Sequence, residues 1–406
     1  MFKTDPVWTK LLTFSLILFF IRLSDSIIAF WAPNQIQNSL NNPIIMGAII
    51  SFQSLVGFAS DLVFPKIFKT VHTRRLFFWA ILLSALTSVA LASSTLKPII
   101  AIFIVTMTLW GIYYELVNFA NFQFMSTSIP GNMRAAAWGF TGIFVNLAYF
   151  LGPFIATKLL SSGILITQGT IIIFLVAALI ILSVGKKKNE TSETVDFGSA
   201  NPLLELKHWA TLSKAVWPAL TIGLLLGFID ATFYTVGAVW TEKLSLVNPW
   251  GVWFLPLYLL PSICLGIPLS NWRIENGKKK LAEKFLGVAG VFFILIGINS
   301  SIQWQLAMVA LAASAVAVCY PLLEGVYTDI LTRMGSEKKD MIGLTGSALN
   351  ISYIIWPVFA GLISARVGER MTFSWLGVMI LVSSLILLLV TPRKIKLPQT
   401  EIKTWE

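Results

Sequence analysis

Long apolar segments separated by short polar ones dominate this chain. Hydrophobic residues make up 56% of its 406 residues and charged residues only 12%, whereas a soluble domain carries about 25% charged residues. A membrane-spanning helix needs about 20 consecutive, mostly apolar residues. The segments that meet this requirement are 10–32, 44–65, 75–94, 98–124, 134–160, 165–184, 214–240, 250–270, 284–301, 305–331, 341–366 and 371–391. The sequence therefore predicts an all-α membrane protein with twelve transmembrane helices.

One stretch of the chain occurs twice. Gly139, Thr141, Gly142, Asn146, Tyr149, Pro153 and Ala156 recur 204 positions later as Gly343, Thr345, Gly346, Asn350, Tyr353, Pro357 and Ala360. Asp25 likewise has a counterpart in Asp230 at an offset of 205. An offset of nearly half the chain indicates a duplication, and halves of equal orientation are parallel repeats. We therefore predict two pseudo-symmetric six-helix bundles, 1–184 and 214–406, joined by a cytoplasmic linker, 185–213.

The basic residues are distributed unevenly between the two ends of the predicted helices. Most of the 30 Lys and Arg residues fall in segments on the side that holds both termini and the linker. By the positive-inside rule that side is cytoplasmic. The sequence thus predicts a multi-pass integral protein of a cell membrane, either a plasma membrane or an inner membrane. Although the net charge is +11, this clustering between apolar segments does not indicate a nucleic-acid-binding face.

Helix number, half-repeat and linker position together resemble a secondary transporter of the major facilitator superfamily, over nearly the whole chain. The most specific local match follows the second apolar segment, where Gly57 precedes Asp61 by four residues and the basic pair Arg74 and Arg75 comes later. This pair lies 13 residues beyond Asp61, further than in the family pattern. The resemblance implies a gating loop at these four residues. The alternative is an interfacial anchor at Asp61 with ordinary cytoplasmic charge at the arginines.

Five charged residues lie near the middle of predicted helices: Arg22, Asp25, Glu115, Asp230 and Glu324. A charged side chain at the centre of a membrane helix costs roughly 2.5–3.5 kcal/mol on insertion scales, so such residues tend to be paired or functional. They fall in the first, fourth, seventh and tenth helices, which line the central cavity in the family that the chain resembles. Arg22 and Asp25 are three residues apart, so they could also simply neutralise each other on one helix face.

Polar and aromatic side chains accompany the buried acids. Asn118 shares a helix face with Glu115, Tyr234 with Asp230, and Tyr327 with Glu324. Such faces suit a solute site. Hydrogen bonding between helices would also explain why an amide such as that of Asn118 lies within a membrane helix. Because burial favours the neutral form of a carboxylic acid, these acids suit either proton coupling or a cationic substrate. The candidate substrate- and proton-binding residues are Arg22, Asp25, Glu115, Asn118, Asp230, Tyr234, Glu324 and Tyr327.

The repeated stretch has two interpretations of its own. Its Gly, Asn, Tyr and Pro residues are spaced to form one stripe on a helix. Close packing at Gly with a kink at Pro would explain the stripe. Alternatively, Asn146, Tyr149, Asn350 and Tyr353 line a cavity and reach the substrate.

These features favour a secondary active transporter of a small organic solute that works by alternating access and is coupled to protons. The alternatives are a multidrug or organic-cation exporter, since aromatic rings attract cations, and a non-transporting receptor or scaffold. An enzyme is not expected, because His72 and His208 lie in separate loops and the HExxH motif is absent from the sequence, as is the GxxxxGK[ST] loop of an ATP-driven pump. We expect no metal or cofactor besides an ion gradient, no nucleic-acid partner, a lipid bilayer environment and a monomer.

Overall fold

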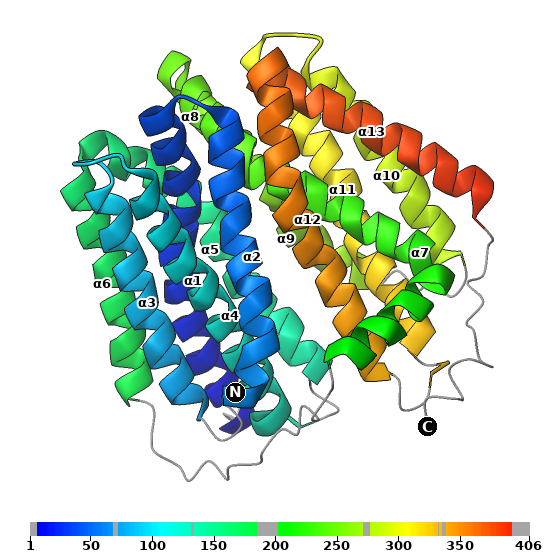
Figure 1. The fold of residues 1–406 in the computed structure, drawn as a ribbon, viewed down its shortest axis with the longest axis horizontal. Coiled ribbons are helices and arrows are strands. Elements are labelled where there is room, and N and C mark those ends of the chain that lie inside the picture. The colour runs from blue at the N-terminus through cyan, green and yellow to red at the C-terminus, as the bar shows by residue number, and fades with distance from the viewer. Residues whose placement is uncertain are drawn as a thin grey trace. The chain divides into compact units, whose positions relative to one another are not determined.

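The computed structural model of the chain describes residues 6–67, 72–130, 134–184, 202–270, 277–331, 333–334 and 338–391. The described residues are almost entirely helical, and none of them forms a β-strand. Contacts between Cα atoms divide the chain into two compact units, Met1–Phe197 and Gly198–Glu406. Figure 1 colours the first unit blue to green and the second green to red.

The first unit is built around its first helix. Its helices are α1 (Pro6–Leu40), α2 (Pro43–Ile67), α3 (Thr73–Ser93), α4 (Ile100–Ser128), α5 (Arg134–Ser162) and α6 (Ile164–Val184). Helix α1 packs against α5 and α6, while α4 packs against α2 and α3 (Figure 1). In the most apolar part of α1 72% of the residues are buried, against 22% in α6. The core of this unit therefore forms around α1.

The second unit has a long first helix that changes its winding along its length. Helix α7 (Pro202–Thr232) continues through the π-helix η2 (Phe233–Gly237) into α8 (Ala238–Val247), and the 3₁₀ turn η3 (Pro249–Trp253) leads into α9 (Phe254–Ser270). The other helices are α10 (Lys278–Ile296), α11 (Ile302–Leu331), α12 (Lys338–Val367) and α13 (Glu369–Val390). Helix α7 packs on α12, α10 packs on α11 and α13, and α9 packs on α11.

Each of the twelve predicted segments corresponds to helix in the structure, with some boundaries displaced. Within the described residues, ten helices are long and apolar enough to span a membrane, and Pro249–Leu265 is a shorter apolar helix. Helix α10 falls outside that set because its first seven residues include five charged ones. Helix α7 begins at Pro202, so the helix extends into the predicted linker 185–213. Residues 185–201 lie outside the described part.

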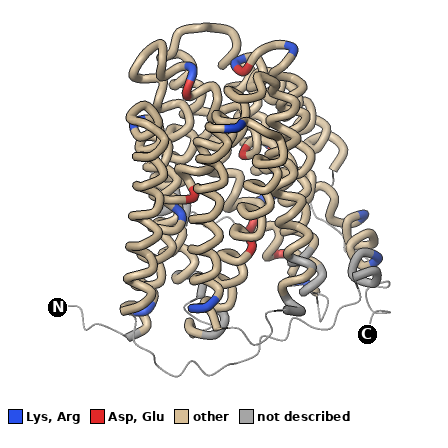
Figure 2. The backbone as a smooth tube through the Cα atoms, turned by 60° about the vertical axis from the view of Figure 1, so that its left-hand side comes forward, with Lys and Arg blue, Asp and Glu red and all other residues tan. Residues whose placement is uncertain are grey.

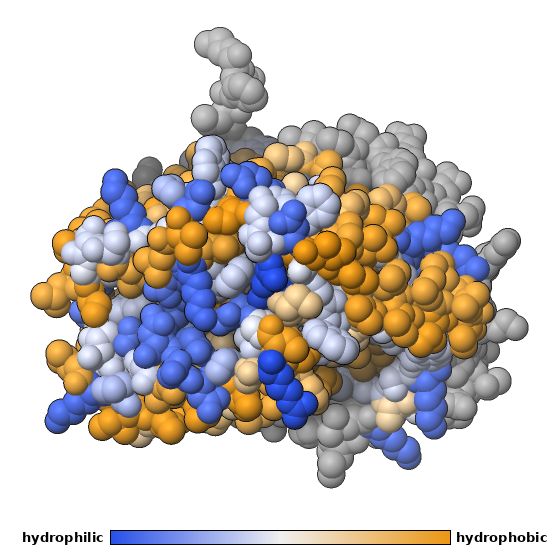
Figure 3. All heavy atoms as spheres, turned by 90° about the horizontal axis from the view of Figure 1, so that it is seen from above, coloured by the Kyte–Doolittle hydropathy of each residue, from blue (hydrophilic) through white to orange (hydrophobic). Residues whose placement is uncertain are grey.

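Charged residues lie mainly toward the ends of the helices, with few in between (Figure 2). Apolar side chains are exposed along the flanks: α6 presents Ile166, Ile173 and Ile180, spaced at seven residues. Figure 3 looks onto one end of the helices and shows hydrophilic residues gathered on the left of the view, with apolar residues between and beside them. Apolar flanks of this kind are the faces that meet lipid in a membrane protein.

Helices α10 and α13 approach so closely that their backbones touch at a pair of glycines. A Cβ added to Gly377 would lie 2.6 Å from the carbonyl oxygen of Gly290 and from the amide nitrogen of Ile294. By contrast, a Cβ on Gly139, Gly142 or Gly346 would meet no atom within 4 Å. These three repeated glycines therefore make no close packing contact inside their own unit.

This difference gives a matched pair of substitutions. Gly377→Ala is expected to lower the free energy of unfolding by about 1–3 kcal/mol, because the added carbon meets backbone that cannot move aside. Gly346→Ala should leave stability unchanged or slightly raised, since alanine favours helix. Thermal unfolding of the purified variants measures both. Equal effects of the two substitutions would contradict the close approach of α10 and α13.

Candidate functional site

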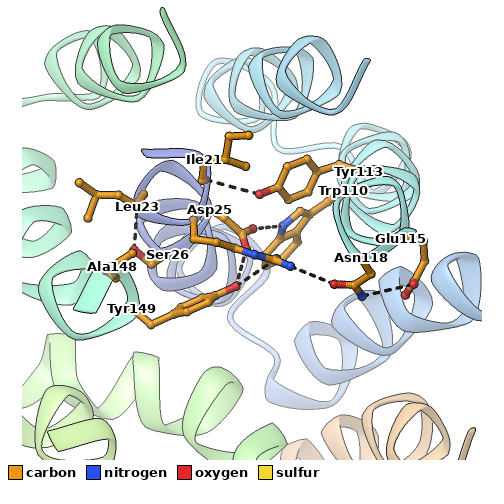
Figure 4. A network of polar contacts seen from close by, with 11 residues as sticks. Ile21, Leu23, Asp25, Ser26, Trp110, Tyr113, Glu115, Asn118, Ala148 and Tyr149 are labelled. Carbon is orange, nitrogen blue, oxygen red and sulfur yellow. Dashed lines mark hydrogen bonds and ion pairs between the residues drawn. The ribbon is translucent and has the colours of Figure 1, made fainter. Parts of the chain in front are cut away.

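Asp25 is the centre of a buried polar network in the first unit (Figure 4). Its Oδ1 accepts a hydrogen bond from Nε1 of Trp110 at 2.7 Å. Its Oδ2 accepts one from the Tyr149 hydroxyl at 2.5 Å and one from Nη1 of Arg22 at 3.3 Å. Arg22 and Asp25 thus form the ion pair that their three-residue spacing allows. Both residues are buried. Burial without such partners would be costly for both charges.

The guanidinium of Arg22 extends the network from α1 to α4. Its Nη2 donates to Oδ1 of Asn118 at 3.0 Å, and its Nη1 lies 3.5 Å from the Tyr149 hydroxyl. The guanidinium carbon also lies 4.6 Å from the centre of the Tyr114 ring, a cation–π distance. Arg22 thus meets a carboxylate, an amide and an aromatic face at once.

Glu115 forms the far end of the same network. Nδ2 of Asn118 donates to its Oε2 at 3.3 Å. Glu115 also lies against α2, because a Cβ added to Gly57 would be 3.1 Å from its Oε1. The network therefore joins residues of α1, α4 and α5 and reaches the helix that carries the predicted gating residue Gly57.

A close contact between α1 and α5 brings Tyr149 to Asp25. The hydroxyl of Ser26 donates to the carbonyl oxygen of Ala148 at 3.1 Å. The same hydroxyl fills the space that a side chain on Gly152 would need. Because Ser26 follows Asp25 and Ala148 precedes Tyr149, this contact sets the register in which tyrosine and carboxylate meet.

Asp230 is the centre of a second polar cluster, in the second unit. The hydroxyl of Tyr258 on α9 donates to its Oδ1, and that of Tyr320 on α11 donates to its Oδ2. Tyr353 on α12 interacts with the same carboxylate. No Lys or Arg of the described chain forms an ion pair with Asp230. Among the described residues, the side chains that hydrogen-bond to this acid are thus tyrosines, whereas Asp25 is paired with an arginine.

The repeated tyrosines lie beside the repeated aspartates. Tyr149 contacts Asp25 in the first unit and Tyr353 contacts Asp230 in the second. Asn146 and Asn350 are half-buried on the same helices, α5 and α12. The repeated stretch therefore contributes at least its tyrosines to the two acidic clusters.

The other candidate residues lie apart from these acids. Glu324 is exposed on α11, and the hydroxyl of Tyr327 donates to the carbonyl oxygen of Ala219 at 3.1 Å. Tyr234 is half-buried in the π-helix. Tyr327 thus faces α7.

The predicted gating loop is described only in part. The side chain of Asp61 lies outside the described part of the chain. Nη2 of Arg74 donates to the carbonyl oxygen of Ser183 at 3.0 Å, near the end of α6, where a cation is favoured by the helix dipole. Arg75 is exposed. This contact ties the start of α3 to the end of α6.

Trp110 and Tyr258 are site residues that the sequence did not identify. Each donates to an aspartate more than 25 residues away in the chain. Aromatic residues are frequent in this chain, so neither position carried a distinguishing signal.

Among the described residues, no group of three or more His, Cys, Asp or Glu side chains is placed to hold a metal ion.

A family model matches most of this chain, and several solved structures share its fold. The family model described as Major Facilitator Superfamily matches residues 14–329. A solved peptide transporter in complex with sulfate has a TM-score of 0.74 and 16% identity, covering 94% of this chain and 94% of that one. A D-xylose-proton symporter has a TM-score of 0.72 and 12% identity, with coverages of 95% and 98%.

A nucleoside transporter is similar to a comparable degree, with a TM-score of 0.68, 11% identity and coverages of 93% and 98%. At these identities the structural likeness establishes the fold alone. The search of curated proteins found no match.

Proposed function

The chain belongs to the Major Facilitator Superfamily, and from this premise we propose that it moves a small organic solute across a membrane by alternating access, coupled to protons. The family and its solved relatives are transporters rather than enzymes. One observation carries the proposal. Each unit holds an aspartate at the repeat position, Asp25 or Asp230, in contact with the tyrosine of the repeated stretch. Paired acids at these positions suit a transport site better than a scaffold, which has no need of buried charge.

Helix pairing supports two pseudo-symmetric repeats, 1–184 and 214–406. Helix α1 packs on α5 as α7 packs on α12, and α2 packs on α4 as α9 packs on α11. Helix α3 also packs on α4 as α10 packs on α11. This correspondence follows the repeat offset, so each pair would derive from the same ancestral unit.

For the setting of the protein, we propose a monomer in a plasma or inner membrane with both termini in the cytoplasm. The distribution of Lys and Arg supports this orientation. A solute, the coupling proton and lipid would be its partners, with no resident cofactor, metal or nucleic acid.

Proton coupling is supported by the chemistry of the buried acids. Glu115 accepts a hydrogen bond from the Asn118 amide and Asp230 accepts one from the Tyr258 hydroxyl, and an acid removed from water can exist in either protonation state. A D-xylose-proton symporter is among the similar structures. Glu115 and Asn118 would bind the polar part of the solute.

Export of an organic cation is the second candidate, and the Asp230 cluster favours it. A carboxylate among tyrosines, with no arginine paired to it in the described chain, suits a positively charged ligand. The two candidates differ in solute charge, so a ligand screen separates them.

The test is a thermal-shift screen of peptides, sugars, nucleosides and organic ammonium ions on the purified protein. We expect one neutral or zwitterionic class to raise the melting temperature, and Glu115→Gln to abolish the shift. Stabilisation by ammonium ions alone would favour the exporter. If no solute stabilised the protein, or if Glu115→Gln retained the full shift, the proposed binding role would be wrong.

A further inference from the structure

We propose that Asp230, and not its repeat counterpart Asp25, binds and releases the coupled proton, and that the hydroxyls of Tyr258 and Tyr320 hold its carboxyl group in both protonation states. This assignment rests on the proposed function, since it concerns which acid carries the proton. It follows from the kind of hydrogen-bonding group that surrounds each aspartate.

Asp25 is ion-paired, and two of its three partners can only donate hydrogen bonds. Trp110 meets Oδ1 through an indole N–H and Arg22 meets Oδ2 through a guanidinium N–H, and neither group can accept a hydrogen bond. A proton on Oδ1 would find no acceptor in Trp110. On Oδ2 it could be accepted only by Tyr149, and the buried guanidinium would then have lost its counter-charge, which is strongly unfavourable.

The partners of Asp230 can accommodate either state. A phenol hydroxyl both donates and accepts, and it rotates to suit its neighbour. With Asp230 ionised, Tyr258 and Tyr320 each donate to one carboxylate oxygen. With Asp230 protonated, one of these hydroxyls turns to accept the new proton, while the other still donates. In both states each carboxyl oxygen keeps a hydrogen bond to a tyrosine hydroxyl without movement of a heavy atom.

The charged and titratable groups around Asp230 are mainly tyrosines, so its carboxylate has no fixed counter-charge in the described chain. Tyr258 faces it from α9, Tyr320 from α11 and Tyr353 from α12, while Tyr234 lies one turn along the same continuous helix. Glu324 lies one turn beyond Tyr320 on α11. In the described chain no basic residue is ion-paired with Asp230. Asp230 is also partly exposed, whereas Asp25 is fully buried.

A residue of the π-helix next to Asp230, Phe233, holds the Tyr258 ring in place. The π-helix Phe233–Gly237 begins three residues after the aspartate, and such insertions are frequent at functional sites. Within it, the Phe233 ring stacks on the Tyr258 ring with centroids 3.9 Å apart and planes at 8°. This stacking fixes the ring while leaving the hydroxyl free to rotate.

Infrared spectroscopy of the purified, substrate-free protein tests the assignment. The carbonyl stretch of a protonated carboxylic acid is followed as the pH is raised. We expect a band that disappears on deprotonation, that is lost in Asp230→Asn, and that persists in Asp25→Asn, Glu115→Gln and Glu324→Gln. Tyr258→Phe combined with Tyr320→Phe should shift the pH at which the band disappears, and Tyr149→Phe should not.

A band that survives in Asp230→Asn, or that Tyr149→Phe shifts as far as the double tyrosine variant does, would overturn the assignment. Asp25→Asn can fail to fold because it disturbs a buried ion pair. The tyrosine variants and Asp230→Asn decide the matter without it. The infrared experiment measures no transport, so failure of the proton-site assignment can be distinguished from failure of the proposed transport function. A titrating Asp230 band in a protein without gradient-driven flux would refute proton-coupled transport and leave the assignment of the titrating group intact.

Discussion

Arg22→Met is expected to lower the free energy of unfolding by about 3–5 kcal/mol, the cost of leaving a buried carboxylate unpaired. Arg22 and Asp25 are both buried, with Nη1 and Oδ2 3.3 Å apart. Methionine fills a similar volume, so the lost counter-charge dominates the effect. Denaturant or thermal unfolding of the purified protein measures the change, with the exposed Arg75→Met as the matched control.

A double variant separates the charge from the packing. In Arg22→Met combined with Asp25→Leu both charges are gone, so most of the lost stability should return. If the double variant were as unstable as the sum of the single ones, the two residues would not act as a pair, and the network around Asp25 would have to be reinterpreted.

Lys279→Met should produce a loss of similar size, about 3–5 kcal/mol, in the second unit. Nζ of Lys279 lies 3.0 Å from Oε1 of Glu283, and both side chains are almost completely buried. Thr391, at the end of α13, donates to the same carboxylate oxygen at 3.0 Å. Oε2 of Glu283 is buried without a hydrogen-bond partner in the described chain, so loss of Lys279 would leave this charge held by Thr391 alone.

The pair Lys243–Glu369, whose lysine is exposed, is the control for this prediction. Its atoms are closer, at 2.5 Å, but the Lys243 side chain is 49% exposed. Water already stabilises the charge of Lys243 and reaches part of the Glu369 side chain, which is 14% exposed, so Lys243→Met should cost less than about 1 kcal/mol. Equal losses in Lys243→Met and Lys279→Met, measured by the same unfolding transition, would show that burial is not what makes the Lys279 pair matter.

Much of the helical architecture could be predicted from hydropathy, because the thickness of a membrane fixes the length of its helices. Helix ends were less accessible. Helix α1 runs on to Leu40 through an amide-rich stretch, and α7 begins at Pro202. Polar residues outside the apolar segments remain helical in both cases, and hydropathy cannot detect that. The change of winding at Phe233–Gly237 likewise has no hydropathy signal.

The contacts of the candidate site were predictable where they join residues that are close together in the sequence. The Arg22–Asp25 pair follows from a spacing of three residues on one helix. The contacts of Asp25 with Trp110 and Tyr149 join residues 85 and 124 positions apart, so they depend on helix packing that the sequence alone does not specify. The duplication marked Tyr149 and Tyr353 as a pair but left open whether they pack or meet an acid. That distinction needed the register set by Ser26 and Ala148.

Gradient-driven flux is the measurement that tests proton-coupled transport most directly. The protein is reconstituted into liposomes, and uptake of the solute that stabilises it is followed with and without an imposed pH gradient. We expect flux that rises with the gradient and falls to the level of empty liposomes when a protonophore dissipates it. Asp230→Asn should abolish the response to the gradient, while exchange of solute across the membrane continues. Flux that is the same with and without the gradient would contradict proton coupling.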